Sequence, residues 1–430
     1  MRVILAVLLL AAAARADCPG DCGGNGAVEV AEIVVGVRIA LGQAPVESCR
    51  AIDADASGHV AVAELVAAVG SALRGCGQSL SFDEPQRYAT GDSPRSLAVA
   101  DLNGDEWPDI VAANHISHDI SILLNDQTGR FLPQTIVPVG MIPLGVVIAN
   151  LNDDAIPDIA TANGGSDDVS VLIGHGDGSF EAEHRFPAAS EARTILTADI
   201  DTNGTTDLVI AAPASTGIPV LLGRGDGTFS RIVIGANFRP WWVALGDVTG
   251  DAIADLVTAN ADSSDLTVLA GLGGGAFVGR SRIALDAAAF AVAIADVDGD
   301  GAADLVTGNA QHHSVSLLLG TGGGGFAMPQ RIAVGGGPFP VHIADMNGDD
   351  SADIVTANEF SDDISICLGR GDGTFAAEQR VAVGDSPYAV ALADVDRDGA
   401  LDLVAATGGA DEVAVRLRSR GRRAEALRNM

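Results

Sequence analysis

An acidic nine-residue loop recurs seven times at nearly constant spacing, and this regularity constrains the fold more than any other feature. The loops begin 48 or 49 residues apart, at Asp101, Asn150, Asp199, Asp247, Asp296, Asp345 and Asp394. A Gly-rich turn that ends in Phe recurs with the same period, at Phe131, Phe180, Phe229, Phe277, Phe326 and Phe375. Seven copies at one period indicate a repeat architecture, in which each unit packs against its neighbours.

Each unit is expected to contain four short strands. In the fifth unit these are residues 290–295, 304–308, 314–320 and 326–334, which are rich in Val, Ile, Leu and Ala and bounded by Gly, Asn, Asp or Pro. Four strands per unit, repeated radially, are typical of a β-propeller. A solenoid would need polar caps at both ends, and none is apparent. We therefore predict an all-β, seven-bladed propeller over residues 79–418.

The phase of the repeat predicts how the ring closes. The seventh unit has no Gly-rich turn ending in Phe, whereas Phe82 precedes the first loop at the distance that separates a Phe from a loop elsewhere. A strand at residues 82–90 is therefore expected to pair with the last blade, which would leave no open sheet edge.

The acidic loops are predicted to bind Ca²⁺, up to seven ions in the propeller. Oxygen-bearing side chains at loop positions 1, 3, 5 and 9 converge in a tight turn, and hard oxygen ligands at this density select Ca²⁺. Softer metals would require His or Cys, which the loops lack. The predicted ligands are Asp101, Asn103, Asp105, Asp109; Asn150, Asn152, Asp154, Asp158; Asp199, Asp201, Asn203, Asp207; Asp247, Thr249, Asp251, Asp255; Asp296, Asp298, Asp300, Asp304; Asp345, Asn347, Asp349, Asp353; and Asp394, Asp396, Asp398, Asp402.

These loops explain much of the acidic composition. They contain 22 of the 57 acidic residues in a chain whose formal net charge is -32. Loops five and seven have four carboxylates each and should bind most tightly, whereas loop two has only two. A charge of -32 without any Lys argues against nucleic acid as a partner. The hydrophobic fraction of 47% argues against a disordered acidic chain.

The motifs resemble those of a known family. Asp-x-Asn/Asp-Gly-Asp-x-x-x-Asp, Asp-Leu-Val-x-Ala-Asn, Val-Ser-Val-Leu-Leu-Gly and Gly-Asp-Gly-Thr-Phe are similar to the FG-GAP/VCBS repeat over residues 79–418. The resemblance implies an integrin-α-like propeller with Ca²⁺ in the loop between the first two strands of each blade. It also implies an extracellular binding or scaffolding role, without identifying a ligand.

The N-terminal segment has a different organisation. Residues 1–16 have the charged start, short apolar run and A-x-A site of a secretory signal peptide, which predicts an extracellular, periplasmic or cell-surface location. Within residues 17–77, an EF-hand-type loop offers Asp53, Asp55, Ser57 and Glu64 as ligands, and an earlier degenerate copy precedes it. This segment resembles a dockerin-like pair that binds one or two Ca²⁺ ions. Docking to a cohesin-like receptor and a structural cap are both open interpretations.

Cysteines and the C-terminus add smaller constraints. Four of the five cysteines lie in the N-terminal segment, where an exported chain would form two disulfides, and three pairings are possible. Cys367 is expected to be a buried free thiol. No stretch after the signal peptide is apolar and long enough for a membrane span. Residues 419–430 are expected to form a basic tail. We expect the protein to be a monomer.

One position at the start of each unit is a candidate ligand surface. It lies six residues before each acidic loop and is occupied by Arg95, Leu144, Arg193, Trp241, Phe290, Phe339 and Tyr388. Aromatic and Arg side chains at a funnel mouth suit a sugar ring or a protein anchor, whereas packing between blades is the alternative interpretation.

No catalytic motif is recognisable in the sequence. A G-x-S-x-G elbow, an H-E-x-x-H helix and a phosphate-binding loop are all missing from it. The sequence favours a non-enzymatic binding or scaffold protein for a protein or carbohydrate ligand. The alternative is a carbohydrate-active lyase or hydrolase that uses carboxylates on the propeller rim.

Overall fold

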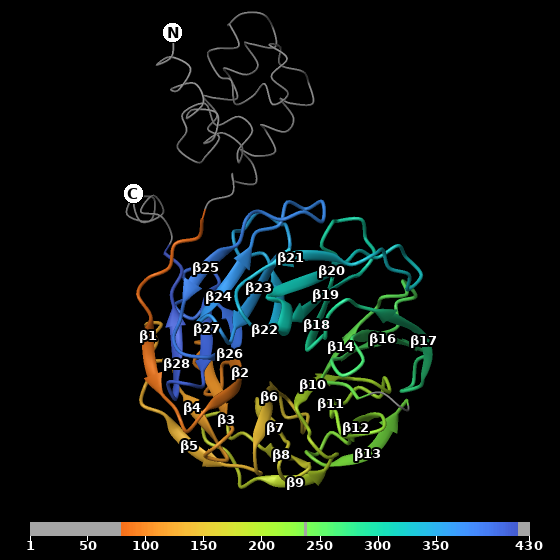
Figure 1. Ribbon diagram of the computed structural model, residues 1–430. Helices are drawn as coiled ribbons and strands as arrows, with labels where there is room; N and C mark the ends of the chain where they lie inside the picture. The colour runs from red at the N-terminus through yellow and green to blue at the C-terminus, as the bar shows by residue number, and fades with distance from the viewer. Residues whose placement is uncertain (1–78, 236–238, 420–430) are drawn as a thin grey trace, which may run out of the picture. The chain divides into compact units, whose positions relative to one another are not determined.

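The computed structural model describes residues 79–235 and 239–419, which form seven four-stranded antiparallel sheets. Figure 1 shows the sheets arranged radially in a ring, with the first strand of each blade innermost. The seven-bladed propeller is therefore confirmed. The predicted signal peptide, the EF-hand module with its four cysteines and the basic tail from residue 420 onwards lie outside the described residues.

The strands follow the repeat. Blades 1 and 2 comprise β2 (Pro94–Ala100), β3 (Asp109–Asn114), β4 (Asp119–Leu123), β5 (Thr135–Pro138), β6 (Pro143–Ala149), β7 (Asp158–Asn163), β8 (Asp168–Leu172) and β9 (His184–Pro187). Blades 3 and 4 comprise β10 (Thr194–Ala198), β11 (Asp207–Ala211), β12 (Ile218–Gly223), β13 (Phe229–Ile234), β14 (Trp242–Gly246), β15 (Asp255–Asn260), β16 (Asp265–Gly271) and β17 (Phe277–Ala284). Blades 5 and 6 comprise β18 (Ala291–Ala295), β19 (Asp304–Asn309), β20 (Ser314–Leu318), β21 (Gln330–Ala333), β22 (Pro338–Ala344), β23 (Asp353–Asn358), β24 (Asp363–Cys367) and β25 (Gln379–Ala382). Blade 7 comprises β26 (Pro387–Ala393), β27 (Asp402–Thr407), β28 (Glu412–Arg416) and the N-terminal β1 (Gln86–Ala89).

Helix is nearly missing from the described part of the chain. A single 3-10 turn, η2 (Ala310–His312), lies between β19 and β20. None of the described helical segments could cross a membrane.

The ring closes as predicted. Strand β1 pairs antiparallel with β28, with Gln86 opposite Val415 and Ala89 opposite Glu412. The Tyr88 ring packs edge-to-face against Phe131 of blade 1, with 5.3 Å between centroids. Residues from opposite ends of the described chain therefore complete one sheet, and the edge of β28 is covered.

The fourth strand of most blades is shorter than predicted. We expected a continuous strand over residues 326–334, but Phe326 forms an isolated bridge with Gly320 and β21 begins at Gln330. The physical reason in blade 5 is Pro329, which has no N–H to donate to the ladder. Likewise, Phe82 forms only an isolated bridge with Arg418, and Pro85 directly precedes β1.

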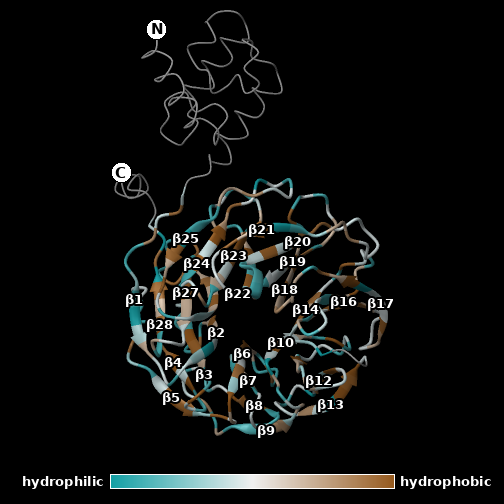
Figure 2. Cartoon of the chain, viewed as in Figure 1, coloured by the Kyte–Doolittle hydropathy of each residue, from teal (hydrophilic) through white to brown (hydrophobic). Residues whose placement is uncertain are grey.

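The hydrophobic core lies between the blades. The middle strands are almost entirely buried because each sheet is covered on both faces by its neighbours, and β3 and β7 are buried over their whole length. One cluster joins Val171 of blade 2 to Leu208 of blade 3. Figure 2 shows hydrophobic residues along these strands, whereas the outermost strands β1 and β9 are largely hydrophilic. Cys367 is confirmed as a buried free thiol, and burial raises its pKa to about 12.

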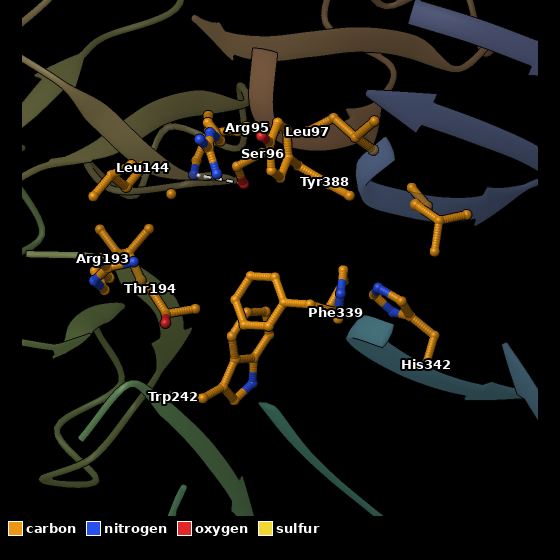
Figure 3. A pocket seen from close by; sticks show the side chains of 17 residues that line it. Arg95, Ser96, Leu97, Leu144, Arg193, Thr194, Trp242, Phe339, His342 and Tyr388 are labelled. Carbon is orange, nitrogen blue, oxygen red and sulfur yellow. Dashed lines mark hydrogen bonds between the residues drawn. The ribbon is translucent and has the colours of Figure 1, made fainter. Parts of the chain in front are cut away.

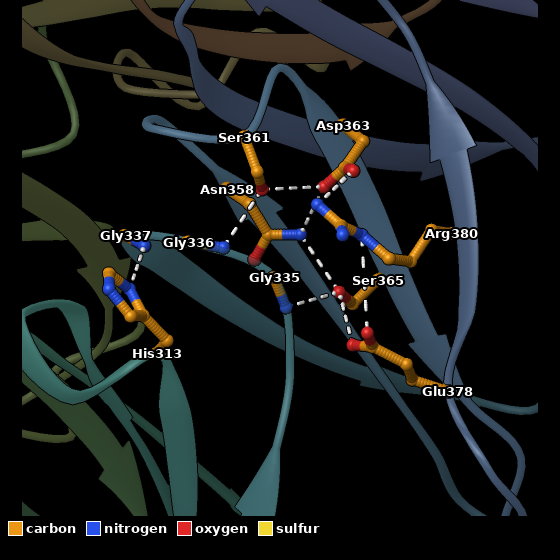
Figure 4. A network of polar contacts seen from close by, with 10 residues as sticks. All are labelled: His313, Gly335, Gly336, Gly337, Asn358, Ser361, Asp363, Ser365, Glu378 and Arg380. Atoms are coloured by element: carbon orange, nitrogen blue, oxygen red, sulfur yellow. Dashed lines mark hydrogen bonds and ion pairs between the residues drawn. The ribbon is translucent and has the colours of Figure 1, made fainter.

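In blades 1, 2 and 6, polar contacts join the blade to the connection that leads to it. In blade 6, the Asn358 side chain donates to Asp363 and Ser365, both at 2.8 Å. The Ser365 hydroxyl in turn accepts from the backbone of Gly335, at 2.9 Å, as Figure 4 shows. Asn114 and Asn163 make the corresponding contacts in blades 1 and 2. The Asn that ends the Asp-Leu-Val-x-Ala-Asn motif therefore has a structural role.

Candidate functional site

The acidic loops connect the first two strands of each blade, and in loops one and four the first residue folds the turn. The Asp101 carboxylate accepts hydrogen bonds from the backbone of Gly104, at 2.8 Å, and of Glu106, at 2.7 Å. Asp247 makes the same contacts with Gly250 and Ala252. The turn requires a positive φ at Gly104 (75°), which glycine adopts without strain. These contacts bring the other oxygen-bearing side chains of the loop together.

The Asp at loop position 9 has a second role that sequence reasoning missed. In loop five, one Asp304 oxygen accepts from the backbone of Val297 at 2.7 Å, and the other accepts from Gly320 at 2.6 Å. All seven position-9 carboxylates make the equivalent pair of bonds. Each is at most 1% exposed. This Asp therefore ties the acidic loop to the turn after the third strand.

A signal for this role was available in the sequence. Position 9 is the one ligand position that is Asp in all seven copies, including loop two, where the first ligand is Asn150. A position that served the cation alone could vary between Asp and Asn, as positions 1, 3 and 5 do.

The electrostatics of the loops favour a bound cation. The pKa of Asp109 is raised to about 6, mainly by burial and also by the neighbouring Asp105 and Asp101, against the lowering effect of its two backbone hydrogen bonds. Burial likewise raises the pKa of Asp402 to about 7, assisted by Asp396 and Asp394. These carboxylates are difficult to ionise in the protein alone, and a divalent cation would offset that cost.

The donor sets of several loops could hold a metal ion. Carboxylate oxygens lie within 4.8 Å of one another in loops three, five and seven, in the groups Asp199, Asp201, Asp207; Asp296, Asp298, Asp300; and Asp394, Asp396, Asp402. In loops two and four, the side-chain oxygens of Asn150 and Thr249 are buried without a hydrogen-bond partner. Both occupy predicted ligand positions, so a cation would satisfy them. The order of affinities among the loops stays a prediction.

A cavity of about 220 Å³ lies at the centre of the propeller and is lined by the first strands of several blades. Five of the seven positions predicted to form the rim line it, namely Arg95, Leu144, Arg193, Phe339 and Tyr388. All seven are partly exposed rather than fully buried. Figure 3 shows Arg95, Tyr388, Phe339, Trp242 and Arg193 around the same space. Their role in ligand binding stays a prediction.

The other two rim residues support the lining without forming it. Trp241 packs edge-to-face on Phe290, at 5.2 Å between centroids, and Phe290 packs on Phe339 at 6.4 Å. Its neighbour Trp242 takes its place in the lining and packs on Phe339 at 5.5 Å. Trp241 has the same register as Arg193, since the backbone N–H of each donates to the carbonyl of an equivalent residue in the second strand, at 2.9 Å, so the side chains and not the backbone register distinguish the two blades.

The rim divides into two arcs. Arg95, Leu144 and Arg193 come from blades 1, 2 and 3, whereas the aromatic residues come from blades 4 to 7. Where the arcs meet, each Arg stacks on a ring. The Arg95 guanidinium carbon is 3.5 Å from the Tyr388 centroid, and that of Arg193 is 4.0 Å from the Trp241 centroid. Such stacking holds the guanidinium planes in fixed orientations.

His342 also lines the cavity, and sequence reasoning missed it. The ring remains partly accessible from the cavity, yet the protein packed around it disfavours the charged form and lowers its pKa to about 4. At neutral pH it is therefore an uncharged imidazole among apolar and aromatic neighbours.

This shift predicts a pH-dependent loss of stability. The unfolded chain takes up a proton at His342 near pH 6.5, whereas the folded protein does so only near pH 4. The free energy of unfolding should therefore fall as pH drops through this window, by up to about 1.4 kcal/mol per pH unit. Because carboxylates also titrate there, the measurement is the difference between wild type and His342→Leu in denaturant titrations. Equal slopes for the two proteins would contradict the prediction.

Comparison with known sequences identifies the repeat. The model of the FG-GAP-like repeat matches residues 101–161, 150–210, 203–258, 247–307, 296–356 and 345–405. The chain belongs to the FG-GAP-like repeat family. No curated protein matches the sequence of this FG-GAP-like repeat protein.

Solved structures resemble the FG-GAP-like repeat protein in fold. BBS1N, solved in complex with ARL6DN, is 13% identical, with a TM-score of 0.57 over 79% of this chain and 97% of that one. Kuenenia stuttgartiensis hydrazine synthase is 13% identical (TM-score 0.55, 77% and 97% covered). The periplasmic gluconolactonase of Pseudomonas aeruginosa is 16% identical (TM-score 0.53, 72% and 98% covered). At these identities the likeness shows a shared fold and leaves the function of the FG-GAP-like repeat protein open.

Proposed function

We propose that this protein is a secreted, calcium-binding, non-enzymatic β-propeller that binds an extracellular protein or carbohydrate ligand at the mouth of its central cavity. The observation that carries the proposal is the cavity lining, in which the partly exposed Phe339, Tyr388 and Trp242 face Arg95 and Arg193. Aromatic and Arg side chains dominate the energetics of binding sites because they combine a large contact area with directed polar groups.

Calcium would have a structural role in this proposal. Bound ions in the acidic loops would neutralise the carboxylates and fix one end of each blade, so that the rim residues keep their positions. Secretion is proposed from the signal-like residues 1–16, and extracellular fluid supplies Ca²⁺ at concentrations that such loops can bind. Residues 17–77 would add a Ca²⁺-stabilised cap or a docking module.

The composition of the lining supports binding over hydrolysis. None of the residues that line the cavity is Asp or Glu. A glycoside hydrolase of the usual kind needs two carboxyl groups facing the scissile bond. BBS1N, a structural relative, was solved in complex with ARL6DN, which is compatible with a protein ligand for this fold.

The test is a binding screen of the purified chain against glycans and secreted proteins in millimolar Ca²⁺, repeated with EDTA. We expect a ligand whose affinity falls at least ~10-fold in Phe339→Ala and Trp242→Ala. Met328→Ala is the matched control, because Met328 is 85% exposed and lies outside the cavity lining. Ligand turnover in the same incubations would favour an enzyme instead, and binding that survives both rim variants would place the site elsewhere.

A further inference from the structure

Two guanidinium groups in the cavity have no acidic partner. Arg95 and Arg193 lie on either side of Leu144, and all three line the cavity. Over residues 79–235 and 239–419, neither Arg takes part in an ion pair. The Nε atom of each is buried without a hydrogen-bond partner. Both side chains are otherwise partly exposed, and a cation that is partly removed from water without an acidic partner favours an anion in the cavity that it lines.

The positive charge is concentrated rather than cancelled. Burial lowers the pKa of Arg193, the attraction of Glu191 opposes this effect, and a smaller repulsion from Arg95 lowers the pKa further. Burial also lowers the pKa of His115, and both arginines lower it further. The cavity is therefore a local positive site in a chain whose formal net charge is -32. An anion bound between the two arginines would relieve their mutual repulsion.

The stacking occupies one face of each guanidinium group and does not use its N–H groups, which are the groups that bind a carboxylate. Tyr388 covers one face of Arg95, and Trp241 covers one face of Arg193. Stacking uses the faces of the guanidinium planes, whereas a carboxylate is bound by the N–H groups at their edges, often through two parallel hydrogen bonds. The arginines are thus held in place before a ligand arrives, which lowers the entropic cost of binding.

The opposite side of the cavity suits a sugar ring. Phe339 and Trp242 form an edge-to-face pair whose apolar surfaces could cover the C–H face of a pyranose. The Ser96 hydroxyl lines the cavity and accepts a hydrogen bond from Val146 at 3.2 Å, so its own hydrogen is left for a ligand oxygen. A volume of about 220 Å³ has room for one sugar residue and is narrow for a folded peptide segment.

We propose that the cavity binds an acidic sugar residue of the uronic acid type, with its carboxylate between Arg95 and Arg193 and its ring against Phe339 and Trp242. The inference rests on the proposed function, because it names the ligand class of the same site.

The experiment is calorimetric titration of the full chain in Ca²⁺ with the methyl glycosides of glucuronic and galacturonic acid and with their neutral counterparts. We expect the acidic sugars to bind at least ~10-fold more tightly, as charge-assisted hydrogen bonds require. Arg95→Gln and Arg193→Gln should each reduce that preference ~10-fold, and added salt should weaken it. Arg193→Lys keeps the charge without the planar fork and should bind with intermediate affinity.

Controls separate this inference from the proposed function. Arg331→Gln removes an exposed Arg paired with Asp286 outside the cavity and should leave affinity unchanged. If acidic and neutral sugars bind equally well, and Phe339→Ala weakens the binding of both, the uronic acid assignment is overturned while the proposed binding site stands. Arg-dependent binding of an acidic peptide but of neither sugar would overturn the sugar class. If a ligand found in the wider screen binds equally well to every rim variant, both the uronic acid inference and the proposed binding site are overturned.

Discussion

Removing Ca²⁺ with EDTA should lower the midpoint of thermal unfolding by roughly 10 °C or more. A site held at a hundredfold above its dissociation constant stabilises the folded state by about 2.7 kcal/mol. In a propeller of about 340 residues, 1 kcal/mol corresponds to roughly 1.5 °C, so three such sites already account for roughly 10 °C. The acidic loops would supply this stabilisation, because burial raises the pKa of carboxylates such as Asp109 and Asp402 and a cation would favour their charged form.

The measurement is differential scanning calorimetry in Ca²⁺, in Mg²⁺ and in EDTA. Mg²⁺ should restore only part of the midpoint, because it demands a stricter octahedral geometry than these loops offer. Variants of the strongest and weakest predicted loops form a matched pair. Asp298→Asn should remove a larger Ca²⁺-dependent increment than Asp154→Asn. An unchanged midpoint in EDTA would show that the loops are ordinary polar turns.

Replacing Asp304 with Ala should destabilise the propeller even when no Ca²⁺ is present. Its carboxylate accepts the backbone N–H groups of Val297 and Gly320, and the side chain is 1% exposed. Removing it leaves two buried donors unsatisfied, which costs roughly 2 to 6 kcal/mol in the free energy of unfolding. Asp304→Asn keeps one acceptor oxygen and should lose about half as much.

Asp300→Ala is the control for this prediction. Asp300 belongs to the same loop but is exposed, and it accepts only a local bond from Ala302 at 2.7 Å. In EDTA its unfolding free energy should match wild type within about 0.5 kcal/mol, whereas its Ca²⁺-dependent increment should shrink. Urea titrations of the three variants and wild type in EDTA and in Ca²⁺ separate the two roles. Equal losses for Asp304→Ala and Asp300→Ala in EDTA would refute the structural role of position 9.

The candidate site was predictable in part. The period of the repeat located Phe339, Tyr388 and both arginines at the cavity, because five of the seven blades present the same position to it. It did not find His342, since one His among apolar residues of an inner strand carries no distinctive pattern. Nor did it show that Trp242 rather than Trp241 lines the cavity. That choice depends on how the two side chains pack, with Trp241 against Phe290 and Trp242 against Phe339, which spacing alone does not report.

The sequence by itself determined the number of blades, the closure by an N-terminal strand and the positions of the acidic loops. All three follow from the spacing of the repeat, which can be read directly from the linear sequence. The tertiary structure decided which groups meet across blades. Arg95 stacks on Tyr388 from the far end of the chain, and Asp304 reaches a turn sixteen residues away. Such contacts depend on how the ring brings distant segments together. The placement of Arg95 and Arg193 at one cavity and the second role of the position-9 Asp are therefore visible only in the folded propeller.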